Sequence, residues 1–180
     1  MSLRPARPAD AACIAAISME VWLGTYLRDG VSPFFAAYAL DTFTLSNTQA
    51  LMTDPHQRIW VSQNADGIDG FVRLTTHSPA PENIPSTTEI STLYVRPRHQ
   101  GKGIGRRLLH AALAHAQQSN TGVVWLATNE ENAPAIAFYN ALGFAAAGQT
   151  HFRIGDRAFP NNVYTYNPGD IPMHETRNLC

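Results

Sequence analysis

Residues 89–129 constrain the fold of this chain more than any other stretch, because they predict a strand, a glycine-rich turn, a helix and a second strand in succession. The run "EISTLYV" is β-prone, and "RPRHQGKGIG" ends it with three glycines, three cationic side chains and a proline. The next segment, "GIGRRLLHAALAHAQQ", repeats its apolar residues at helical spacing. The apolar face of this helix consists of Ile104, Leu108, Leu109, Ala112, Leu113 and Ala116.

The segment after that helix, "VVWLATN", is a short apolar run typical of a strand buried on both faces. A strand, helix and strand of this length form a crossover connection, which joins parallel strands. The sequence therefore predicts that the strands around residues 89–95 and 123–129 run parallel.

The remaining elements are predicted from periodicity and turn residues. Asn132 is the expected cap of a second helix in "NEENAPAIAFYNALGF", with Pro134 in its first turn and Gly143 at its end. "ADGIDG" reads as the turn of a β-hairpin, and "SPAPENIPSTT" as a loop. Further strands are expected in 2–6, 58–63, 71–77, 144–155 and 157–167, and further helices in 11–22, 32–40 and 46–52.

Composition excludes several classes of protein. The chain has 180 residues, which fits one domain, and its net charge of −1 argues against sequence-independent binding to nucleic acid. No apolar run approaches the length of a membrane span, so a soluble protein is expected. Cys13 and Cys180 have no partner spacing, which favours free thiols and a cytoplasmic location. The histidines share no metal-ligand spacing, and no metal is expected.

The glycine turn is suited to hold phosphate groups. A turn of this kind exposes backbone N–H groups at the positive end of a helix dipole, and Lys102, Arg106 and Arg107 add cations there. A plain tight turn with solvated basic residues explains the glycines about as well. A P-loop is disfavoured because Gly103 follows Lys102, and a dinucleotide fingerprint is disfavoured because the turn reads G-x-G-x-G.

Two motifs together resemble the GNAT N-acetyltransferase superfamily. Gln100, Gly103 and Gly105 in "QGKGIG" match its acetyl-CoA motif, Q/R-x-x-G-x-G/A, and "NEENAPAIAFYNALGF" is similar to its second signature. Within the superfamily, "NEENAPAIAFYNALGF" followed by "GQTHFRIGD" is similar to the bacterial polyamine acetyltransferases. The resemblance covers most of the chain and is weakest over residues 24–58.

The resemblance implies an α/β (α+β) fold with a central mixed, mostly antiparallel sheet, a splayed parallel strand pair and flanking helices. From its own sequence, the segment 168–180 reads as a C-terminal extension that is exposed or swapped in a homodimer. The resemblance implies a GNAT domain over residues 1–167. It also implies that acetyl-CoA is the cosubstrate. The residues that would bind it are Leu93, Tyr94, Val95, Gln100, Gly101, Lys102, Gly103, Ile104, Gly105, Arg106, Asn132 and Tyr139.

Acetyl transfer to an amine needs a base, because an alkyl amine with a pKa near ~10.4 arrives protonated at neutral pH. Glu89 is the candidate, with a solvent-facing strand-end carboxylate as the competing interpretation; Ala127 stands where some relatives carry a glutamate. Tyr139 matches the family tyrosine that protonates the leaving thiolate, and its competing role is a core aromatic.

The acceptor is the least constrained part of the prediction. A small amine of the polyamine type is expected, for which Asp29, Glu82 and Asp156 are candidate contacts. Trp22, Tyr26, Phe34 and Phe35 are candidates for a substrate groove, although packing is the more common role of such residues. The alternatives are a protein N-acetyltransferase, a non-catalytic acyl-CoA sensor and a nucleotide-binding regulator.

Overall fold

The computed structural model describes residues 2–27 and 29–170, with the side chain of residue 170 excepted. These residues form two compact units: one consists of the described residues within Met1–Leu74 and Thr92–His110, and the other of the described residues within Thr75–Ser91 and Ala111–Cys180. Two strands and one helix pass from one unit into the other along the chain.

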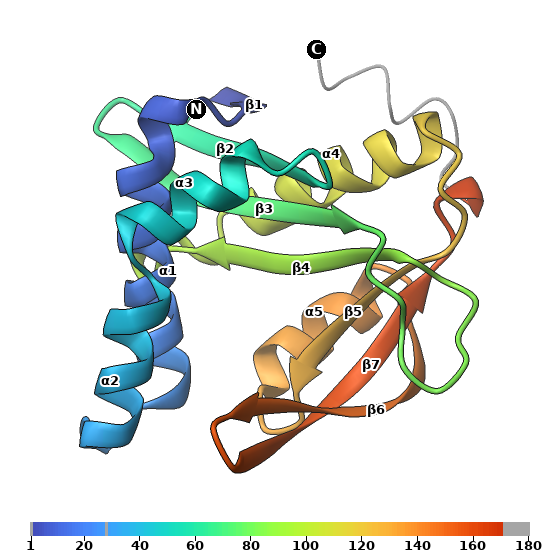
Figure 1. Ribbon diagram of the computed structural model, residues 1–180. Coiled ribbons are helices and arrows are strands. Elements are labelled where there is room, and N and C mark those ends of the chain that lie inside the picture. The colour runs from blue at the N-terminus through green and yellow to red at the C-terminus, as the bar shows by residue number, and fades with distance from the viewer. Residues whose placement is uncertain (1, 28, 171–180) are drawn as a thin grey trace. The chain divides into compact units, whose positions relative to one another are not determined.

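The strands form one seven-stranded sheet in the order β1-β2-β3-β4-β5-β7-β6 (Figure 1). β4 and β5 pair in parallel through Thr88↔Val124 and Glu89↔Trp125, whereas β5 and β7 pair antiparallel over six residues each. The mixed, mostly antiparallel sheet and its parallel pair confirm the fold class predicted from the sequence. The strands are β1 (Ser2–Pro5), β2 (Gln57–Asn64), β3 (Gly67–Thr76), β4 (Thr88–Val95), β5 (Val124–Asn129), β6 (Ala145–Ile154) and β7 (Arg157–Tyr166).

The helices begin at residues that cap them or favour a first turn. Ser32 accepts a hydrogen bond from the Phe35 amide, and Thr44 accepts one from the Asn47 amide. The α-helices are α1 (Ala11–Tyr26), α2 (Pro33–Thr42), α3 (Leu45–Thr53), α4 (Ile104–Gln118) and α5 (Ala133–Ala141). Short 3₁₀ turns are η1 (Pro8–Asp10), η2 (Pro97–His99) and η3 (Pro168–Asp170). The rest of the predicted C-terminal extension, 171–180, lies outside the described residues.

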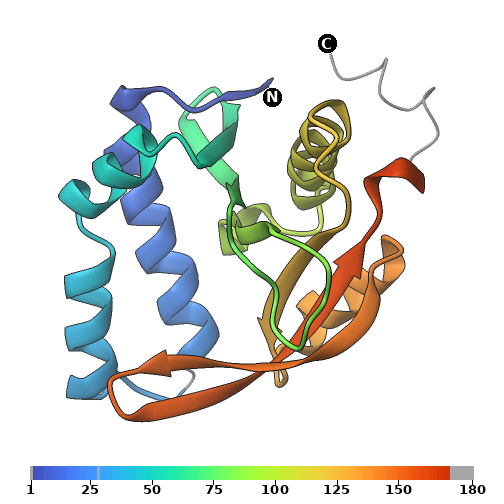
Figure 2. The same ribbon diagram turned by 45° about the vertical axis from the view of Figure 1, so that its right-hand side comes forward.

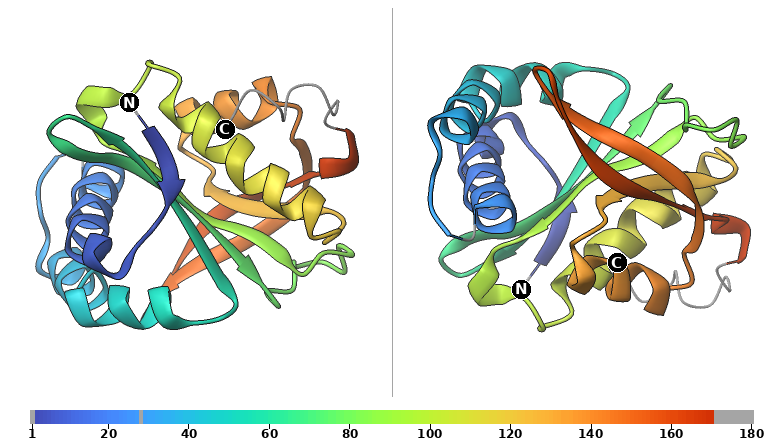
Figure 3. Two further views of the ribbon diagram at one scale, coloured as in Figure 1. Left: turned by 90° about the horizontal axis from the view of Figure 1, so that it is seen from above. Right: turned by 90° about the horizontal axis from the view of Figure 1, so that it is seen from below.

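In the first unit, helices cover both faces of the strands. α1 packs on one face of these strands (Figure 3). There Ile14, Ile17 and Val21 meet Val61 and Phe71 in an apolar core. The N-terminal half of α4 lies on the other face, since a Cβ at Gly70 would lie 3.3 Å from the Leu108 side chain. β3 is therefore shielded from water on both faces over residues 69–72.

The buried face of α4 agrees with the prediction from helical spacing. Every residue assigned to that face is almost completely buried, and these residues are Ile104, Leu108, Leu109, Ala112, Leu113 and Ala116. Their common burial explains why a chain segment with several basic and histidine side chains still forms a stable helix, because packing of the apolar face supplies most of its stability.

One part of the hairpin prediction is wrong. The turn between β2 and β3 contains only Ala65 and Asp66, and β3 begins at Gly67. Asp69 and Gly70, which the sequence assigned to the turn, belong to the strand, and Asp69 is buried. The Asn64 side chain accepts hydrogen bonds from the amides of Asp66 and Gly67, so this turn closes earlier than its glycines suggest.

In the second unit, β5, β7 and β6 form an antiparallel sheet that ends in a long twisted hairpin (Figure 2). The hairpin register shifts between Ala146 and Gly148, which marks a β-bulge. α5 packs on this sheet through Tyr139, whose ring centroid lies 6.5 Å from that of Tyr164. Phe144, between α5 and β6, packs against Tyr166 with centroids 4.9 Å apart.

The N-terminal strand is fastened to the first unit by a charged pair. Arg4 Nη1 and Nη2 donate to the two Asp10 carboxylate oxygens at 2.7 and 2.9 Å, and the Arg7 amide donates to Asp10 Oδ2 at 2.7 Å. The hydrogen bonds from Arg4 lower the pKa of Asp10, and this effect exceeds the opposing effect of burial. Asp10 therefore stabilises the fold only while it is ionised.

We expect Asp10→Asn to lower the free energy of unfolding at pH 7 by about 1–3 kcal/mol, the usual size of a lost charged hydrogen bond. Because the folded pKa lies below the unfolded value of ~3.9, this contribution is complete above the unfolded pKa and is lost as pH falls through the folded pKa. Denaturant melts from pH 7 to pH 2.5 should therefore show the two proteins converging below about pH 4. Asp156→Asn, a change at the exposed β6–β7 turn, is the control. A constant difference at all pH values would contradict the assignment.

Candidate active site

The glycine turn lies in the first unit, between η2 and α4. Gly101 and Gly103 have φ values of +75° and +76°, a backbone conformation that residues with a side chain rarely adopt. A Cβ at either position would have no atom within 4 Å. The turn therefore needs glycine for its conformation, and the space beside its backbone is open.

The start of α4 presents unpaired amides beside that space. The Arg107 amide donates to the Gly103 carbonyl at 3.2 Å, so the amides of residues 103–106 are those that the helix leaves without an intrahelical acceptor. Lys102 and Arg106 are exposed at the same helix end. Amides at the positive end of a dipole, with two cations beside them, fit the pyrophosphate of a coenzyme A thioester.

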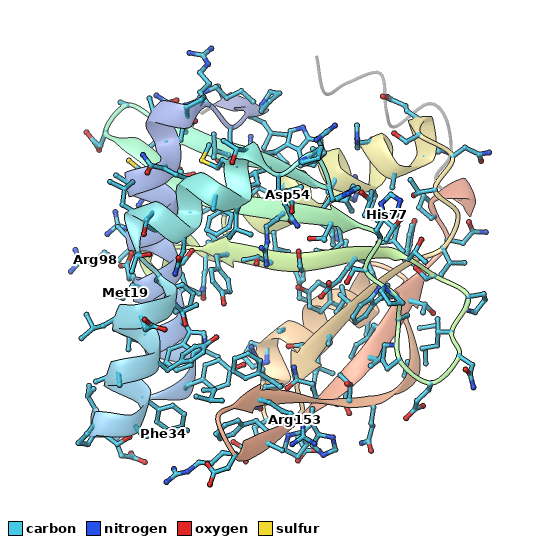
Figure 4. The ribbon with its side chains drawn as sticks, in the orientation of Figure 1. Met19, Phe34, Asp54, His77, Arg98 and Arg153 are labelled. Atoms are coloured by element: carbon cyan, nitrogen blue, oxygen red, sulfur yellow. The ribbon has the colours of Figure 1, made fainter. Side chains whose placement is uncertain are left out.

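The turn is held in place by contacts to the strands. Gln100 Nε2 donates to the Val95 carbonyl at 3.1 Å, so the side chain of this predicted cofactor residue fastens the turn to the end of β4. The Arg96 amide donates to the Asp69 carbonyl at 3.0 Å, and Arg96 Nε donates to Glu20 Oε2 at 2.7 Å. Figure 4 labels Arg98, an exposed residue of η2.

The Asp69 side chain lies next to η2, which leads into the same turn. It is 1% exposed, its Oδ2 accepts from Asn64 Nδ2 at 3.0 Å, and the same oxygen lies 3.7 Å from His99 Nδ1. Asp69 was not predicted as a site residue, because it lies in a segment, 65–70, whose glycines and aspartates are typical of a turn. A charged residue inside the apolar run "GIDGFVRL" was the signal for a buried carboxylate with a specific partner.

The predicted cofactor-binding part of β4 also belongs to the first unit. Leu93, Tyr94 and Val95 are half-buried. The Tyr94 ring packs edge-on against Phe71, with centroids 5.7 Å apart, so β4 is fixed against the apolar core at this end. Ile104 is buried, and Gly105 lies in the first turn of α4.

The other predicted residues lie in the second unit. Glu89 is half-buried near the start of β4, where its Oε2 accepts a hydrogen bond from Ser78 Oγ at 2.7 Å. The prediction from sequence had not paired Glu89 with any residue. Ser78 is part of the proline-rich loop, 77–87, and only the folded structure brings it to the strand.

Asn132 has the capping role that was predicted. Its Oδ1 accepts from the Ala135 amide at 3.2 Å, and Pro134 stands in the first turn of α5. The amide nitrogen of the side chain is not used by the cap. Capping therefore leaves Asn132 able to donate a hydrogen bond to a ligand.

Tyr139 lies in the aromatic core of the second unit. Its ring contacts those of Phe138, Phe144 and Tyr164 at centroid distances of 5.3, 5.5 and 6.5 Å. Burial raises the pKa of Tyr139 well above the ordinary value for tyrosine. The hydroxyl therefore stays protonated at neutral pH. Toward an anionic group, such as a thiolate, it acts as a hydrogen-bond donor.

Two of the three carboxylates considered for a polyamine site, Glu82 and Asp156, lie apart within the second unit. The Glu82 side chain lies at the β-bulge, because a Cβ at Gly148 would clash with its carboxylate. Asp156 lies in the β6–β7 turn, beyond the rest of β6, a span of roughly 20 Å at the usual rise of a strand. Asp29 belongs to the first unit and is exposed.

The aromatic residues of α1 and α2 pack against one another. The Trp22 ring is almost fully buried, and its centroid lies 4.9 Å from that of Tyr26, 5.9 Å from that of Phe35 and 5.0 Å from that of Tyr38. Phe34, labelled in Figure 4, contacts Phe35 at 5.3 Å. This agrees with the packing role, which the sequence favoured over a substrate groove.

Membrane-spanning helices and metal centres are both absent from the part of the chain that the structure describes. Within residues 2–27 and 29–170, no helix is long and apolar enough to cross a membrane. Over the same residues, no three His, Cys, Asp or Glu side chains are grouped so that they could hold a metal ion.

Comparison with known proteins relates this chain to one family. The sequence profile of the acetyltransferase (GNAT) family matches residues 22–144. Streptothricin acetyltransferase from Streptomyces lavendulae is 30% identical over 159 residues, which is 81% of this chain and 82% of that protein.

Solved structures extend the likeness to the fold. The crystal structure of PaiA N-acetyltransferase from Thermoplasma acidophilum in complex with coenzyme A has a TM-score of 0.71 at 17% identity, covering 92% of this chain and all (100%) of that one. The structure of nourseothricin acetyltransferase has a TM-score of 0.54 at 28% identity, covering 63% of this chain and 66% of that one. The matched span 22–144 includes the glycine turn, Asn132 and Tyr139.

Proposed function

Since this chain belongs to the GNAT family of acetyltransferases, we propose that it transfers the acetyl group of acetyl-CoA to a primary amine of a small molecule. The observation that carries the choice of a small acceptor is its likeness to streptothricin acetyltransferase, which spans four fifths of both chains. A polyamine is the second acceptor to test, because the sequence motifs resemble that branch.

Acetyl-CoA is the donor, and the amides of residues 103–106 with Lys102 and Arg106 are the groups that we propose to bind its pyrophosphate. Backbone groups of Leu93 to Val95 are proposed to bind the pantetheine arm. The side-chain amide of Asn132 is a further candidate for a contact with acetyl-CoA. Gln100 contributes by fastening the turn to the carbonyl of Val95.

The proposed reaction is direct attack within a ternary complex. The acceptor arrives as an ammonium ion and gives one proton to Glu89, directly or through water, and that proton later leaves to solvent. The amine nitrogen then attacks the thioester carbonyl carbon, so that a C–N bond forms and the C–S bond breaks. The second proton leaves the nitrogen as the amide forms, and the coenzyme A thiolate takes up a proton to become the thiol.

Tyr139 is proposed to stabilise the leaving thiolate. A phenol whose pKa is raised by burial is a weak acid, so a hydrogen bond to the sulfur is favoured over complete loss of its proton. Tyr139 would keep its proton and donate a hydrogen bond to the sulfur. This hydrogen bond would stabilise the negative charge of the thiolate as the C–S bond breaks.

The test is the release of free thiol from acetyl-CoA with a panel of acceptors: streptothricin, spermidine and a short peptide with a free N-terminus. We expect release with at least one of the two small amines, at a kcat/KM of roughly 100-fold or more above that of the peptide. Release with the peptide alone would show a protein N-acetyltransferase instead. Binding of acetyl-CoA without release for any amine would show an acyl-CoA sensor.

A further inference from the structure

The loop between β3 and β4 delivers one hydroxyl group to the candidate base. Ser78 Oγ donates to Glu89 Oε2 at 2.7 Å, a short hydrogen bond to a carboxylate. Ser78 lies eleven residues before Glu89, and the intervening residues 79–87 form a loop without helix or strand. Backbone hydrogen bonds are enough to close a loop of this kind. A side-chain hydrogen bond that ends on the proposed base therefore suggests a role for Ser78 other than closing the loop.

The backbone of Ser78 is fixed on both sides. Its amide donates to the Thr87 carbonyl at 2.9 Å, and its carbonyl accepts from the indole Nε1 of Trp125 at 2.9 Å. Trp125 is buried in β5 and is the residue that pairs with Glu89 in the parallel ladder. The indole therefore holds Ser78 beside the strand position that Glu89 occupies, and the three residues form one connected network.

The residue before Ser78 has an uncommon backbone conformation. His77, labelled in Figure 4 at the end of β3, has a φ of +59°, in the left-handed region that residues other than glycine seldom occupy. This conformation turns the chain sharply as it leaves β3. Backbone strain of this kind persists where the surrounding contacts hold it, and here the contacts are those that fix Ser78.

We propose that Ser78 is a positioning residue, which orients the Glu89 carboxylate for proton abstraction, with Trp125 fixing Ser78 in turn. This inference rests on the proposed function of Glu89 as the base. The hydrogen bond from Ser78 Oγ fixes the position of Glu89 Oε2 at a distance of 2.7 Å. It also restricts the rotation of a glutamate side chain, which otherwise samples several rotamers.

The chain offers a matched control in the same loop. Ser86 Oγ donates to the Val123 carbonyl at 2.6 Å, so Ser86 joins the loop to the strand region in the same way, through a bond that does not involve Glu89. Ser86→Ala should therefore lower thermal stability and leave the kinetics unchanged. Ser78→Thr keeps the hydroxyl and is the conservative variant.

The experiment measures kcat and KM for acetyl-CoA with streptothricin or spermidine, whichever the wild type acetylates faster. We expect Ser78→Ala to lower kcat by roughly 3- to 10-fold at an unchanged KM for acetyl-CoA, the effect of losing one hydrogen bond, and Ser78→Thr to recover most of it. In the Glu89→Gln background, Ser78→Ala should have no additional effect on kcat, because the residue acts through Glu89.

The three ways in which this proposal can fail are distinct. A wild type that acetylates no amine overturns the proposed function, and this inference with it. An active wild type whose Glu89→Gln variant turns over normally overturns the base and the role of Ser78. In the third case, Glu89→Gln lowers kcat but Ser78→Ala leaves kcat normal, or lowers it no more than Ser86→Ala does. Ser78 would then be merely structural, and the inference would be wrong.

Discussion

Gly103→Val is expected to weaken the binding of acetyl-CoA by at least about 30-fold, with little change in kcat at saturating cofactor. The φ of Gly103 is +76°, and a β-branched residue in this region costs about 2 kcal/mol of strain. The chain relieves that strain by rotating the backbone at residue 103, which moves the first amides of α4 away from the phosphate groups. A loss of about 2 kcal/mol is a factor of about 30 in the dissociation constant. Isothermal titration with acetyl-CoA measures it.

Gly122→Val is the matched control for this prediction. Gly122 has nearly the same φ, +73°, and a Cβ added there would also have no atom within 4 Å, but it lies in the turn between α4 and β5. The two variants should lose similar thermal stability, and only Gly103→Val should lose affinity for acetyl-CoA. Equal affinities in both variants would show that the glycine turn is not the phosphate site.

The sequence predicted well those parts of the fold that depend on local pattern. The buried face of α4, the cap at Asn132 and the parallel pairing of β4 with β5 follow from helical spacing, residue type and segment length. The glycine turn was predicted for the same reason, since a left-handed backbone and a helix start are both encoded within a few residues.

Contacts between distant segments were not predictable in this way. The bond from Ser78 to Glu89 depends on how the loop 77–87 folds back, and no periodicity describes that loop. The indole of Trp125 reaches Ser78 across 47 residues of sequence. Asp69 was misread because an aspartate followed by glycine is typical of turns, whereas its strand position follows from partners far along the chain.

The same distinction applies to the proposed chemistry. The proposed phosphate-binding part rests on backbone amides beside glycines, so it could be proposed from the sequence, where a plain tight turn explained the glycines about as well. The acceptor is selected by side chains whose grouping depends on tertiary packing. The separation of Glu82 from Asp156 within the second unit shows that carboxylates in plausible segments need not form one site.

Tyr139→Phe is expected to lower kcat by roughly 100-fold while changing the KM for acetyl-CoA by less than about twofold. Phenylalanine retains the ring that packs against Phe138, Phe144 and Tyr164, so only the hydroxyl is lost. Without a donor at the sulfur, the thiolate must leave as a free anion, which raises the barrier of the step that breaks the C–S bond. Steady-state kinetics with saturating amine measures both constants.

Tyr164→Phe separates the role of the hydroxyl from its place in the aromatic core. Tyr164 is as well buried as Tyr139 and is its ring neighbour on β7. We expect this variant to turn over within about twofold of the wild type, because its hydroxyl has no proposed part in the reaction. Burial also raises the pKa of Tyr139, so its deprotonation should not diminish wild-type turnover as pH rises towards about 10. A normal kcat in Tyr139→Phe, or equal losses in both variants, would remove Tyr139 as the donor to the leaving thiolate.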